Sequence, residues 1–549
     1  MSNAYFQVPE PYNEPVLSYK PGSAEREALK AKLVEMGSRQ IEVPLIIGGR
    51  EIKTGHTAEM GLPHNHSHKM GVYHQAGEKE VAMAIEAALA ARKTWAEMPW
   101  EDRASIFLKA ADLLAGPWRS TLNAATMLGQ SKTVHQAEID SACELIDFWR
   151  FNVYYMAQLM ADQPYSPPGM WNRVEYRPLE GFVFAITPFN FTAIAGNLPT
   201  APAMVGNVVL WKPSPSAVYS AYYLIRLWKE AGLPDGVINF IPGPAPEIAA
   251  QLLASPDLAG VHFTGSTAVF KNIWKTVGDT MTARKYYPRL VGETGGKDFI
   301  FAHNSARIDE LIVAAIRGAF EYQGQKCSAA SRMYIPASIW PEFKGKYVAE
   351  VGKIKMGDPA DFTNFVAAVI NQAAFDKIKG YIEYARASDE AEILTGGHYD
   401  DSIGYFIEPT TIVTTNPKFK TMQEEIFGPV LTIYVYDDDR FDETLELCNT
   451  TSPYGLTGCV WAQDRQMLAR MSDKLRNAAG NFYINDKPTA AVVGQQPFGG
   501  GRASGTNDKA GSAMNLLRWL TVRTIKETMV PPHNWRYPHM ADEQTRERG

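Results

Sequence analysis

The chain has 549 residues, of which 45% are hydrophobic, and this length predicts two or three domains with a large core. Its formal net charge is −6 and its sequence carries no run of Lys or Arg, which argues against a nucleic-acid partner. The four cysteines have no paired spacing, which favours a reducing compartment.

Helical periodicity dominates the first third of the chain. Up to about Gly48, the pattern predicts an N-terminal arm and one helix, Ala24 to Met36. Further helices are predicted over Glu78–Trp95, Glu101–Leu114 and Ala137–Met160. The start of the chain has neither a charged segment before an apolar core nor an Arg-rich amphipathic pattern, so we expect no targeting segment there.

The segment His64-Asn65-His66-Ser67-His68 has the spacing of a metal site on a strand, because alternate side chains share one face. No cysteine or carboxylate framework accompanies the three histidines. We therefore favour a surface segment and expect no metal.

Residues 181–211 contain no charged side chain, but Pro188, Pro199 and Pro202 break the stretch, so we expect no membrane span. We interpret this stretch as a buried strand, Phe182 to Ile186, then a turn, a short helix and a second strand, Val208 to Trp211. A third strand, Gly260 to Phe263, leads into a helix, and a fourth ends at Glu293.

Each of these four strands ends in a residue or motif that could bind a ligand. Asn190 follows the first, Lys212 the second, and Gly265-Ser266 the third, while Glu293 ends the fourth. Open α/β sheets bind their ligands at the carboxyl ends of parallel strands. The sequence therefore predicts a site at this edge.

Cys327 lies in Gly324-Gln325-Lys326-Cys327, between a predicted helix, Leu311 to Phe320, and a predicted strand, Met333 to Ile335. Small, polar and basic neighbours could leave its thiol partly exposed and near the nucleophilic thiolate form. Taken alone, a free cysteine is more often a buried hydrophobic residue than a nucleophile.

A second alternation of strands and helices runs from Phe299 to Asn485, which indicates another parallel sheet. A Pro-rich segment, Gln163 to Arg177, interrupts the first unit. The charged end of the chain, Ala541 to Gly549, is expected to fray.

The order and spacing of several motifs resemble the aldehyde dehydrogenase superfamily. The motifs are Thr187-Pro188-Phe189-Asn190, Trp211-Lys212-Pro213-Ser214, Phe263-Thr264-Gly265-Ser266, Glu293-Thr294-Gly295-Gly296-Lys297, Gly324-Gln325-Lys326-Cys327 and Glu424-Glu425-Ile426-Phe427-Gly428-Pro429-Val430. A closer resemblance is to the Δ1-pyrroline-5-carboxylate dehydrogenase branch. It runs from about Asn13 to Thr528 and is most diagnostic at Ala137–Asp140, Glu144–Phe148, Ala319–Tyr322, Gly480–Lys487 and Gly494–Gly500.

The resemblance implies an α/β fold with a Rossmann-type cofactor domain, an α/β catalytic domain and a small oligomerisation arm. We expect the NAD-binding domain at residues 1–162 and 179–295, and the catalytic domain at 296–510. Residues 163–178 and 511–549 would form the arm and the C-terminal tail of a homodimer or higher homo-oligomer. The expected compartment is the cytoplasm of a bacterium, or the mitochondrial matrix of a eukaryote once a transit peptide is removed.

The resemblance also implies a covalent mechanism. Cys327 would attack the aldehyde as a thiolate and form a thiohemiacetal, while the Asn190 amide and the Cys327 backbone N–H stabilise the oxyanion. After hydride transfer to a nicotinamide, Glu293 would activate the water that hydrolyses the thioester.

For NAD, the resemblance implies contacts around the helix start at Ser266 and around Lys212 and Glu425. Phe270 stands where many relatives have a second glycine. Pro215 replaces an acidic residue of many NAD-preferring relatives, so the residues themselves leave NADP open while the branch favours NAD. The predicted cofactor-binding residues are Thr187, Lys212, Ser214, Gly265, Ser266, Thr267, Glu425 and Phe427.

A small-molecule substrate with a carboxylate would be held by the Ser328 hydroxyl and the loop at Ala490-Ala491, where relatives often carry Gly-Ser. The predicted substrate-binding residues are Glu144, Phe191, Ser328, Ala490, Ala491 and Phe498. The implied activity is NAD-dependent oxidation of L-glutamate γ-semialdehyde to L-glutamate in proline catabolism. The alternatives are a dehydrogenase for another aldehyde and a catalytically silent oligomer.

Overall fold

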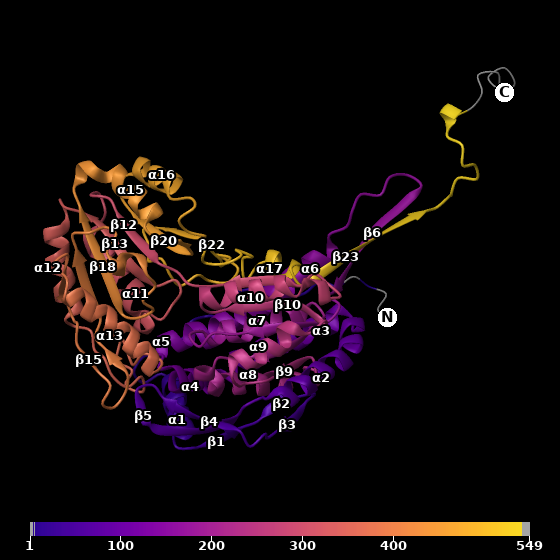
Figure 1. The fold of residues 1–549 in the computed structure, drawn as a ribbon, viewed down its shortest axis with the longest axis horizontal. Helices are drawn as coiled ribbons and strands as arrows, with labels where there is room; N and C mark the ends of the chain where they lie inside the picture. Colours follow the sequence, from indigo (N-terminus) through magenta and orange to yellow (C-terminus); the bar gives the residue numbers. More distant parts are fainter. Residues whose placement is uncertain (1–3, 5, 541–549) are drawn as a thin grey trace.

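The computed structural model describes residue 4 and residues 6–540, and the segment 541–549 that we expect to fray lies outside them. Figure 1 shows two lobes and a ribbon that projects away from them. Each lobe is built around one seven-stranded sheet. The predicted α/β class with parallel sheets is therefore confirmed.

The first sheet has the strand order β11-β10-β7-β8-β9-β2-β3. The five strands β11, β10, β7, β8 and β9 run parallel to one another. At the β9 side, β2 pairs antiparallel with β9, and β3 pairs antiparallel with β2. The parallel strands are buried on both faces, which is why the sequence there reads as unbroken apolar runs. The strands are β2 Leu45–Ile47, β3 Arg50–Ile52, β7 Phe182–Ile186, β8 Val208–Lys212, β9 Ile238–Phe240, β10 Leu258–Thr264 and β11 Arg289–Glu293.

Helices surround this sheet, and α2 and α7 pack directly on its strands. The charge-free stretch of the sequence is β7, α7 and β8, whose burial explains the missing charges. The helices of this lobe are α1 Ala24–Gly37, α2 Glu78–Glu97, α3 Trp100–Ala115, α4 Arg119–Gln130, α5 Val134–Ala137, α6 Leu145–Ala161, α7 Thr192–Met204, α8 Val218–Ala231, α9 Ala245–Ala254 and α10 Thr267–Asp279.

The single helix predicted over Ala137–Met160 is wrong in its first part. The structure has the short helix α5, then a π-helical turn over Glu138–Glu144, and then α6. The π-turn buries the carboxylates of Glu138 and Asp140, and both accept hydrogen bonds from other segments. The periodicity of the sequence does not reveal such a turn, because the turn shifts the helical face by only one residue.

The sequence pattern also missed three strands near the N-terminus: the first has only three residues, too few for a period, and the burial along the third does not alternate. β1 Ile41–Val43 joins β4 Thr57–Leu62 and β5 Asn65–His74 in a small sheet.

The histidine segment meets this sheet. His64 is buried in the turn before β5, so the prediction of a surface segment is wrong for that residue. Its Nδ1 lies 2.6 Å from Ser131 Oγ, while His66 and His68 contact the carbonyls of Asp401 and Gly37. The rings diverge, and within the described part of the chain no group of His, Cys, Asp and Glu is arranged to hold a metal.

The second sheet has the order β14-β17-β18-β13-β12-β20-β21, and only β14 runs antiparallel. Two hydrophobic clusters cover its two faces. The strands are β12 Asp298–Ala302, β13 Ala330–Pro336, β14 Ala391–Thr395, β17 Thr410–Thr414, β18 Val430–Tyr436, β20 Thr457–Trp461 and β21 Asn481–Ile484. The helices are α11 Ile308–Phe320, α12 Trp340–Val351, α13 Gln372–Arg386, α14 Lys420–Gln423, α15 Phe441–Thr450 and α16 Arg465–Lys474.

Short elements complete the fold. They are β15 Tyr399–Asp400 with β16 Phe406–Ile407, β19 Tyr454–Gly455 with β22 Gly501–Arg502, and α17 Ala513–Leu517. Among the described residues, no helix is long and apolar enough to cross a membrane.

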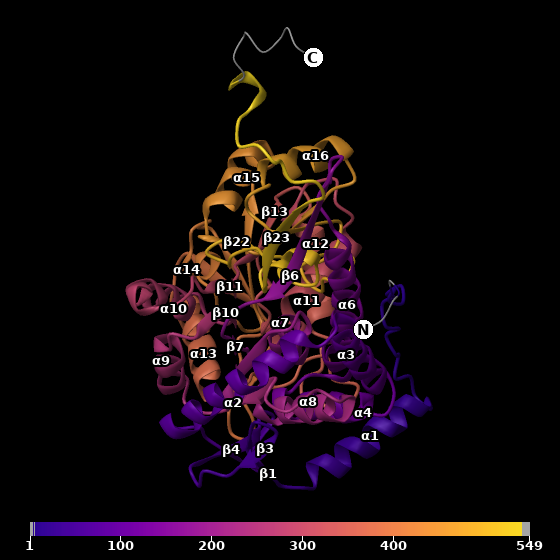
Figure 2. The ribbon, with the colours of Figure 1, turned by 90° about the vertical axis from the view of Figure 1, so that its right-hand side faces the viewer.

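The projecting ribbon consists of β6 Met170–Pro178 and β23 Leu520–Thr528, paired antiparallel along their whole length (Figures 1 and 2). It joins the two segments for which the sequence predicts an oligomerisation arm. Trp171 and Val522 on this ribbon are about half exposed.

Candidate active site

A cavity of about 490 Å³ contains the predicted nucleophile and the predicted substrate residues. Its walls come from both lobes and include segments that are hundreds of residues apart. Among the residues that line it are Cys327, Glu293, Glu144, Phe191, Ser328, Ala490, Ala491 and Phe498.

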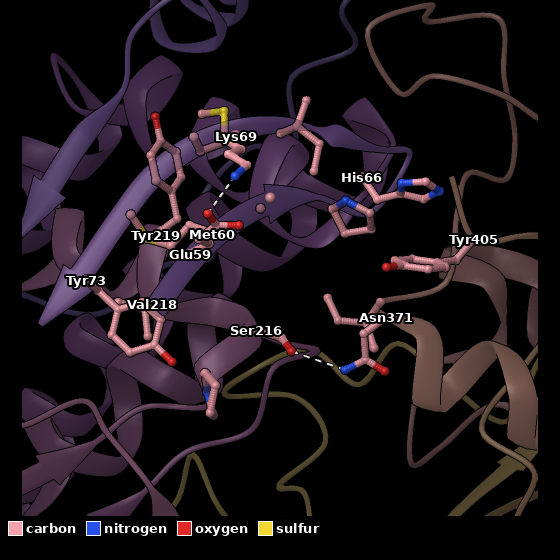
Figure 3. A pocket seen from close by; sticks show the side chains of 17 residues that line it. Glu59, Met60, His66, Lys69, Tyr73, Ser216, Val218, Tyr219, Asn371 and Tyr405 are labelled. Carbon is pink, nitrogen blue, oxygen red and sulfur yellow. Dashed lines mark hydrogen bonds and ion pairs between the residues drawn. The ribbon is translucent and has the colours of Figure 1, made fainter. Parts of the chain in front are cut away.

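A second cavity, of about 300 Å³, lies elsewhere, between the β4–β5 hairpin, the start of α8 and the segment 370–405 (Figure 3). Ser216 and Asn371 form a hydrogen bond across it, and Lys69 pairs with Glu59 at its edge. None of the predicted site residues lines it.

Cys327 lies on a loop between α11 and β13 whose backbone is held in an unusual conformation. Tyr322, Gln323 and Gly324 have φ of 50°, 55° and 65°, in the left-handed region. A Cβ on Gly324 would lie 2.1 Å from the carbonyl oxygen of Gly428, so only glycine fits there. The Gln323 amide donates to the carbonyls of Ser131 and Ala368 and fixes the loop.

The electrostatic surroundings of the thiol set its pKa. Burial, followed by the carboxylates of Asp298 and Glu293, raises the pKa of the Cys327 thiol well above its ordinary value. Lys326 does not offset this effect at the thiol, because its ammonium pairs with Glu321 at 3.1 Å. Cys327 is partly exposed, and its raised pKa means that the thiol needs a base to become the reactive thiolate, so a thiol near its thiolate form stays a prediction.

Asn190 lies just before α7, and its side chain is buried. Its Nδ2 donates to the carbonyl of Gln325 at 3.1 Å, two residues before Cys327. The amide is thus fixed beside the nucleophile loop, where the sequence predicted an oxyanion donor.

A buried ion pair, which sequence reasoning missed, holds the start of α7. The Asp140 carboxylate accepts from the backbone N–H groups of Thr192 and Ala193, and from Lys132 Nζ at 2.7 Å. The same ammonium lies 4.1 Å from the ring centre of Phe191 and 4.5 Å from that of Tyr322. Lys132 therefore ties the helix start that follows Asn190 to the loop of Cys327.

Glu293 ends β11 and turns its carboxyl into the cavity. Burial raises its pKa well above the ordinary value, although the backbone N–H of Gly500 and the Lys509 ammonium act in the opposite direction. Its Oε2 is buried without a hydrogen-bond partner. A buried, unpaired carboxyl oxygen that faces a cavity is a candidate general base.

The glycine turn around Gly500 packs against Glu293. A Cβ on Gly499 would lie 3.0 Å from Glu293 Oε1, so the glycine leaves room for the carboxylate. Lys509 Nζ donates to the carbonyls of Gly480 and Gly499 at 2.9 Å and holds the turn.

The predicted cofactor residues on β7 and β8 lie side by side at the carboxyl edge of the first sheet. Thr187 Oγ1 accepts from the Trp211 indole at 2.9 Å, and Ser214 precedes the turn into α8. Burial lowers the pKa of Lys212 to about 8, and no ion pair involving Lys212 is found among the described residues. A buried, unpaired lysine fits a role as a donor to ribose hydroxyls.

The start of α10 provides the next part of this edge. Ser266 caps the helix by accepting from the Val269 N–H, and Gly265 would clash with Phe263 if it had a Cβ. The free N–H groups of such a helix start suit a pyrophosphate. Phe270, which replaces a glycine of relatives, stacks on Phe263 in the core and leaves the helix start open.

The remaining predicted cofactor residues come from other segments. Thr267 Oγ1 accepts from the Gly295 N–H, and Glu425 Oε1 accepts from the Gly296 N–H at 2.9 Å. Phe427 has φ of 63° and packs edge-on against Phe189. The donors and acceptors at this edge fit a dinucleotide.

In the cavity wall next to Cys327, Ser328 Oγ lies 2.8 Å from Thr489 Oγ1. Ala490-Ala491 offers no hydroxyl, but Thr489 supplies one to the same cavity. Ala490 has φ of 71°, a conformation that suits the glycine of relatives better than alanine.

Four side chains with basic groups also line the cavity: His135, Arg317, Lys326 and Lys487. They come from separate elements, so no local motif could have grouped them. Glu144 faces the same cavity, and burial followed by the charge of Asp140 raises its pKa well above the ordinary value. No hydrogen bond of its side chain is found in the described part of the chain.

Comparisons with known proteins agree with this arrangement. The sequence model of the aldehyde dehydrogenase family matches residues 53–525. Delta-1-pyrroline-5-carboxylate dehydrogenase, mitochondrial, from Dictyostelium discoideum is 51% identical over 538 residues, which is 97% of this chain and 96% of that protein. The human protein of the same name is 51% identical over 529 residues, which is 96% of this chain and 94% of that protein.

Solved structures show the same likeness. The crystal structure of the Delta-pyrroline-5-carboxylate dehydrogenase from Mycobacterium tuberculosis bound with NAD superposes with a TM-score of 0.96 at 52% identity, covering 98% of this chain and 100% of that one. The 1-pyrroline-5-carboxylate dehydrogenase from Thermus with bound NAD gives a TM-score of 0.90 at 34% identity, covering 95% of this chain and 100% of that one.

Proposed function

The chain belongs to the aldehyde dehydrogenase family, and we propose that it oxidises L-glutamate γ-semialdehyde to L-glutamate with NAD in proline catabolism. The observation that carries this proposal is the cavity in which Cys327 and Glu293 meet the paired hydroxyls of Ser328 and Thr489. The relatives named delta-1-pyrroline-5-carboxylate dehydrogenase support the substrate. The NAD-bound relatives support the cofactor.

The first chemical step is the attack of Cys327 on the aldehyde carbon. Burial, followed by the carboxylates of Asp298 and Glu293, raises the pKa of the thiol and so favours its protonated form. Glu293 lines the same cavity with an unpaired carboxyl oxygen, and we propose it as the base that takes the thiol proton. Loss of the thiol proton gives the thiolate, and attack gives a thiohemiacetal on Cys327.

The negative charge that develops on the aldehyde oxygen needs donors that are already in place. The Asn190 amide is held beside the nucleophile loop, and the Cys327 backbone N–H is the second donor. The NAD site at the carboxyl edge of the first sheet supplies the hydride acceptor when it is filled. Once Glu293 has released the thiol proton to solvent, it takes a proton from a water molecule whose oxygen attacks the thioester; the acid forms and Cys327 leaves as the thiolate.

The substrate's carboxylate would bind where the hydroxyls of Ser328 and Thr489 line the cavity. The hydroxyls of Ser328 and Thr489, the backbone at Ala490 and Ala491, and the nearby Lys487 offer donors there. Phe191 and Phe498 would pack on the aliphatic carbons, and Glu144 lies in the wall.

We further propose a homodimer or higher homo-oligomer that uses the β6–β23 ribbon. A two-stranded ribbon alone is marginally stable in water, and half-exposed Trp171 and Val522 on it favour a covering surface. The domain boundaries at 162, 178, 295 and 510 remain predictions. The mitochondrial matrix is the proposed compartment for a eukaryotic source, and the cytoplasm for a bacterial one.

The substrate assignment predicts a selectivity that a panel of aldehydes can measure. We expect glutamate semialdehyde to exceed butanal in kcat/KM by about tenfold or more, because hydrogen bonds to a charged group contribute about 1.5–3 kcal/mol each. Ser328→Ala should reduce the preference, since it removes one donor and leaves Thr489 unpaired. The control Thr489→Ser keeps both hydroxyls and should retain it. Equal kcat/KM for both aldehydes in the unmodified protein would leave another aldehyde as the substrate.

The raised pKa of Glu293 predicts a particular pH dependence. A base works only when deprotonated, so a raised carboxyl pKa shifts activity toward higher pH. The raised thiol pKa of Cys327 acts in the same direction. We therefore expect kcat to keep rising through neutral pH, where an ordinary glutamate with a pKa of about 4.3 would be fully ionised. A plateau that is already complete in mildly acidic buffer would contradict this assignment.

A further inference from the structure

An irregular N-terminal segment, residues 12–17, forms one wall of the substrate cavity. Asn13, Glu14 and Val16 line that cavity, although they lie more than 300 residues before Cys327 in the chain. The segment has no secondary structure of its own. Its path is therefore set by side-chain contacts.

Asn13 joins two parts of the site through its amide. Its Nδ2 donates to Asp147 Oδ2 in α6 and to the Val493 carbonyl, both at 2.8 Å. Its Oδ1 accepts from Gln495 Nε2 at 2.9 Å. Val493 and Gln495 belong to the loop 487–496, which also carries Thr489, Ala490 and Ala491.

The segment on which Asn13 lies is itself firmly anchored. The Glu14 carboxylate accepts from Arg119 at 2.6 Å and from Arg150 at 2.7 Å, and all three side chains are about nine-tenths buried. The Glu14 N–H donates to Asp147 Oδ1, and the Leu17 N–H donates to Glu138. These bonds make the segment a fixed support.

The loop 487–496, by contrast, carries a local turn: the Gln495 and Gln496 N–H groups donate to the Val492 carbonyl, which fixes the turn but not its place against α6. It belongs to no strand or helix, and Ala490 and Gly494 have φ of 71° and 83°. A Cβ on Gly494 would lie 2.2 Å from the Phe151 ring, so the loop lies directly against α6. Its position over α6 therefore depends on the few bonds that reach it, and Asn13 makes two of them.

We propose that Asn13 is a positioning residue for substrate specificity: it fixes the loop 487–496, and so the donors that receive the carboxylate of an anionic aldehyde. This inference rests on the proposed function, because it concerns the carboxylate end of that substrate. Asn13 acts through the loop and leaves the reacting aldehyde group to Cys327 and Asn190.

The test compares Asn13→Ala with the unmodified full chain on two aldehydes, glutamate semialdehyde and butanal. We expect KM for the semialdehyde to rise about tenfold, since the loop loses two hydrogen bonds. Its kcat, and kcat/KM for butanal, should change by less than about twofold. Glu10→Gln is the matched control, because Glu10 is exposed just before this segment and makes no contact that is found among the described residues. It should leave both substrates unchanged.

Three results would overturn the inference. An Asn13→Ala protein that retains its preference for the semialdehyde shows that the loop does not need Asn13. Equal losses on both aldehydes show a merely structural role. If the unmodified protein has no preference, the proposed substrate fails and this inference fails with it.

Thermal unfolding shows whether Asn13→Ala is folded. If it is not, Gln495→Ala, which removes one bond from the loop side, must raise the semialdehyde KM about threefold, and an unchanged KM overturns the inference.

Discussion

Replacing Cys327 with alanine is expected to abolish aldehyde oxidation while NAD binding remains measurable. The thiol is the group that we propose to form the bond to the aldehyde carbon, so the covalent path is lost with it. Removal of a covalent nucleophile typically lowers kcat by ~10,000-fold or more. The measurement is NADH formation by the purified variant, together with a titration of NAD binding. The sulfur makes no hydrogen bond that is found in the described structure, so the fold should tolerate its loss.

Cys143→Ala is the matched control for this prediction. Cys143 lines the same cavity, but its sulfur is held by contacts with Arg119, Glu138 and the Pro15 carbonyl. We expect its replacement to leave most of the activity. Substantial turnover by Cys327→Ala, or equal losses in both variants, would remove Cys327 as the nucleophile.

Asn190→Ala should lower kcat by ~100-fold or more, the scale typical of losing one oxyanion donor. The amide bonds the Gln325 carbonyl at 3.1 Å in the resting structure and is held there by the start of α7. Charge develops on the substrate oxygen only during the reaction, so its loss should appear in kcat more than in KM. Steady-state kinetics with glutamate semialdehyde at saturating NAD measure both.

Asn197→Ala tests whether this loss is specific. Asn197 lies on α7, the helix that follows Asn190, lines the substrate cavity and accepts from Asn152 Nδ2 at 3.0 Å. Its replacement disturbs packing without removing the proposed donor, so kcat should fall much less. A change in KM alone for Asn190→Ala would show that Asn190 positions the substrate and does not stabilise the oxyanion.

Much of the first sheet could be predicted because its strands are buried on both faces. β7 was predicted with the bounds that the structure shows, and β8 and β10 differ by one to three residues. Short strands and the π-helical turn were missed, since neither produces a period that differs from its neighbours. The burial of His64 was also missed, because it depends on α4 and its following residue Ser131.

The sequence by itself determined the residue types of the site and their order: an asparagine and a lysine after successive strands, a glutamate at the end of another, and a cysteine after a glycine. Backbone geometry at strand ends is local, so such motifs are visible in the chain. The placement of these residues at one edge follows from the parallel sheet.

Only the tertiary structure decided how these groups behave. The pKa of the Cys327 thiol is set by its burial and by carboxylates from β11 and β12, which no neighbouring residue in the chain reveals. The ion pair of Lys132 with Asp140, the hydroxyl of Thr489 and the bonds of Asn13 likewise join separate segments. Electrostatic energies and hydrogen bonds depend on distance in space, and residues 482 positions apart in the chain leave no shared pattern in the sequence.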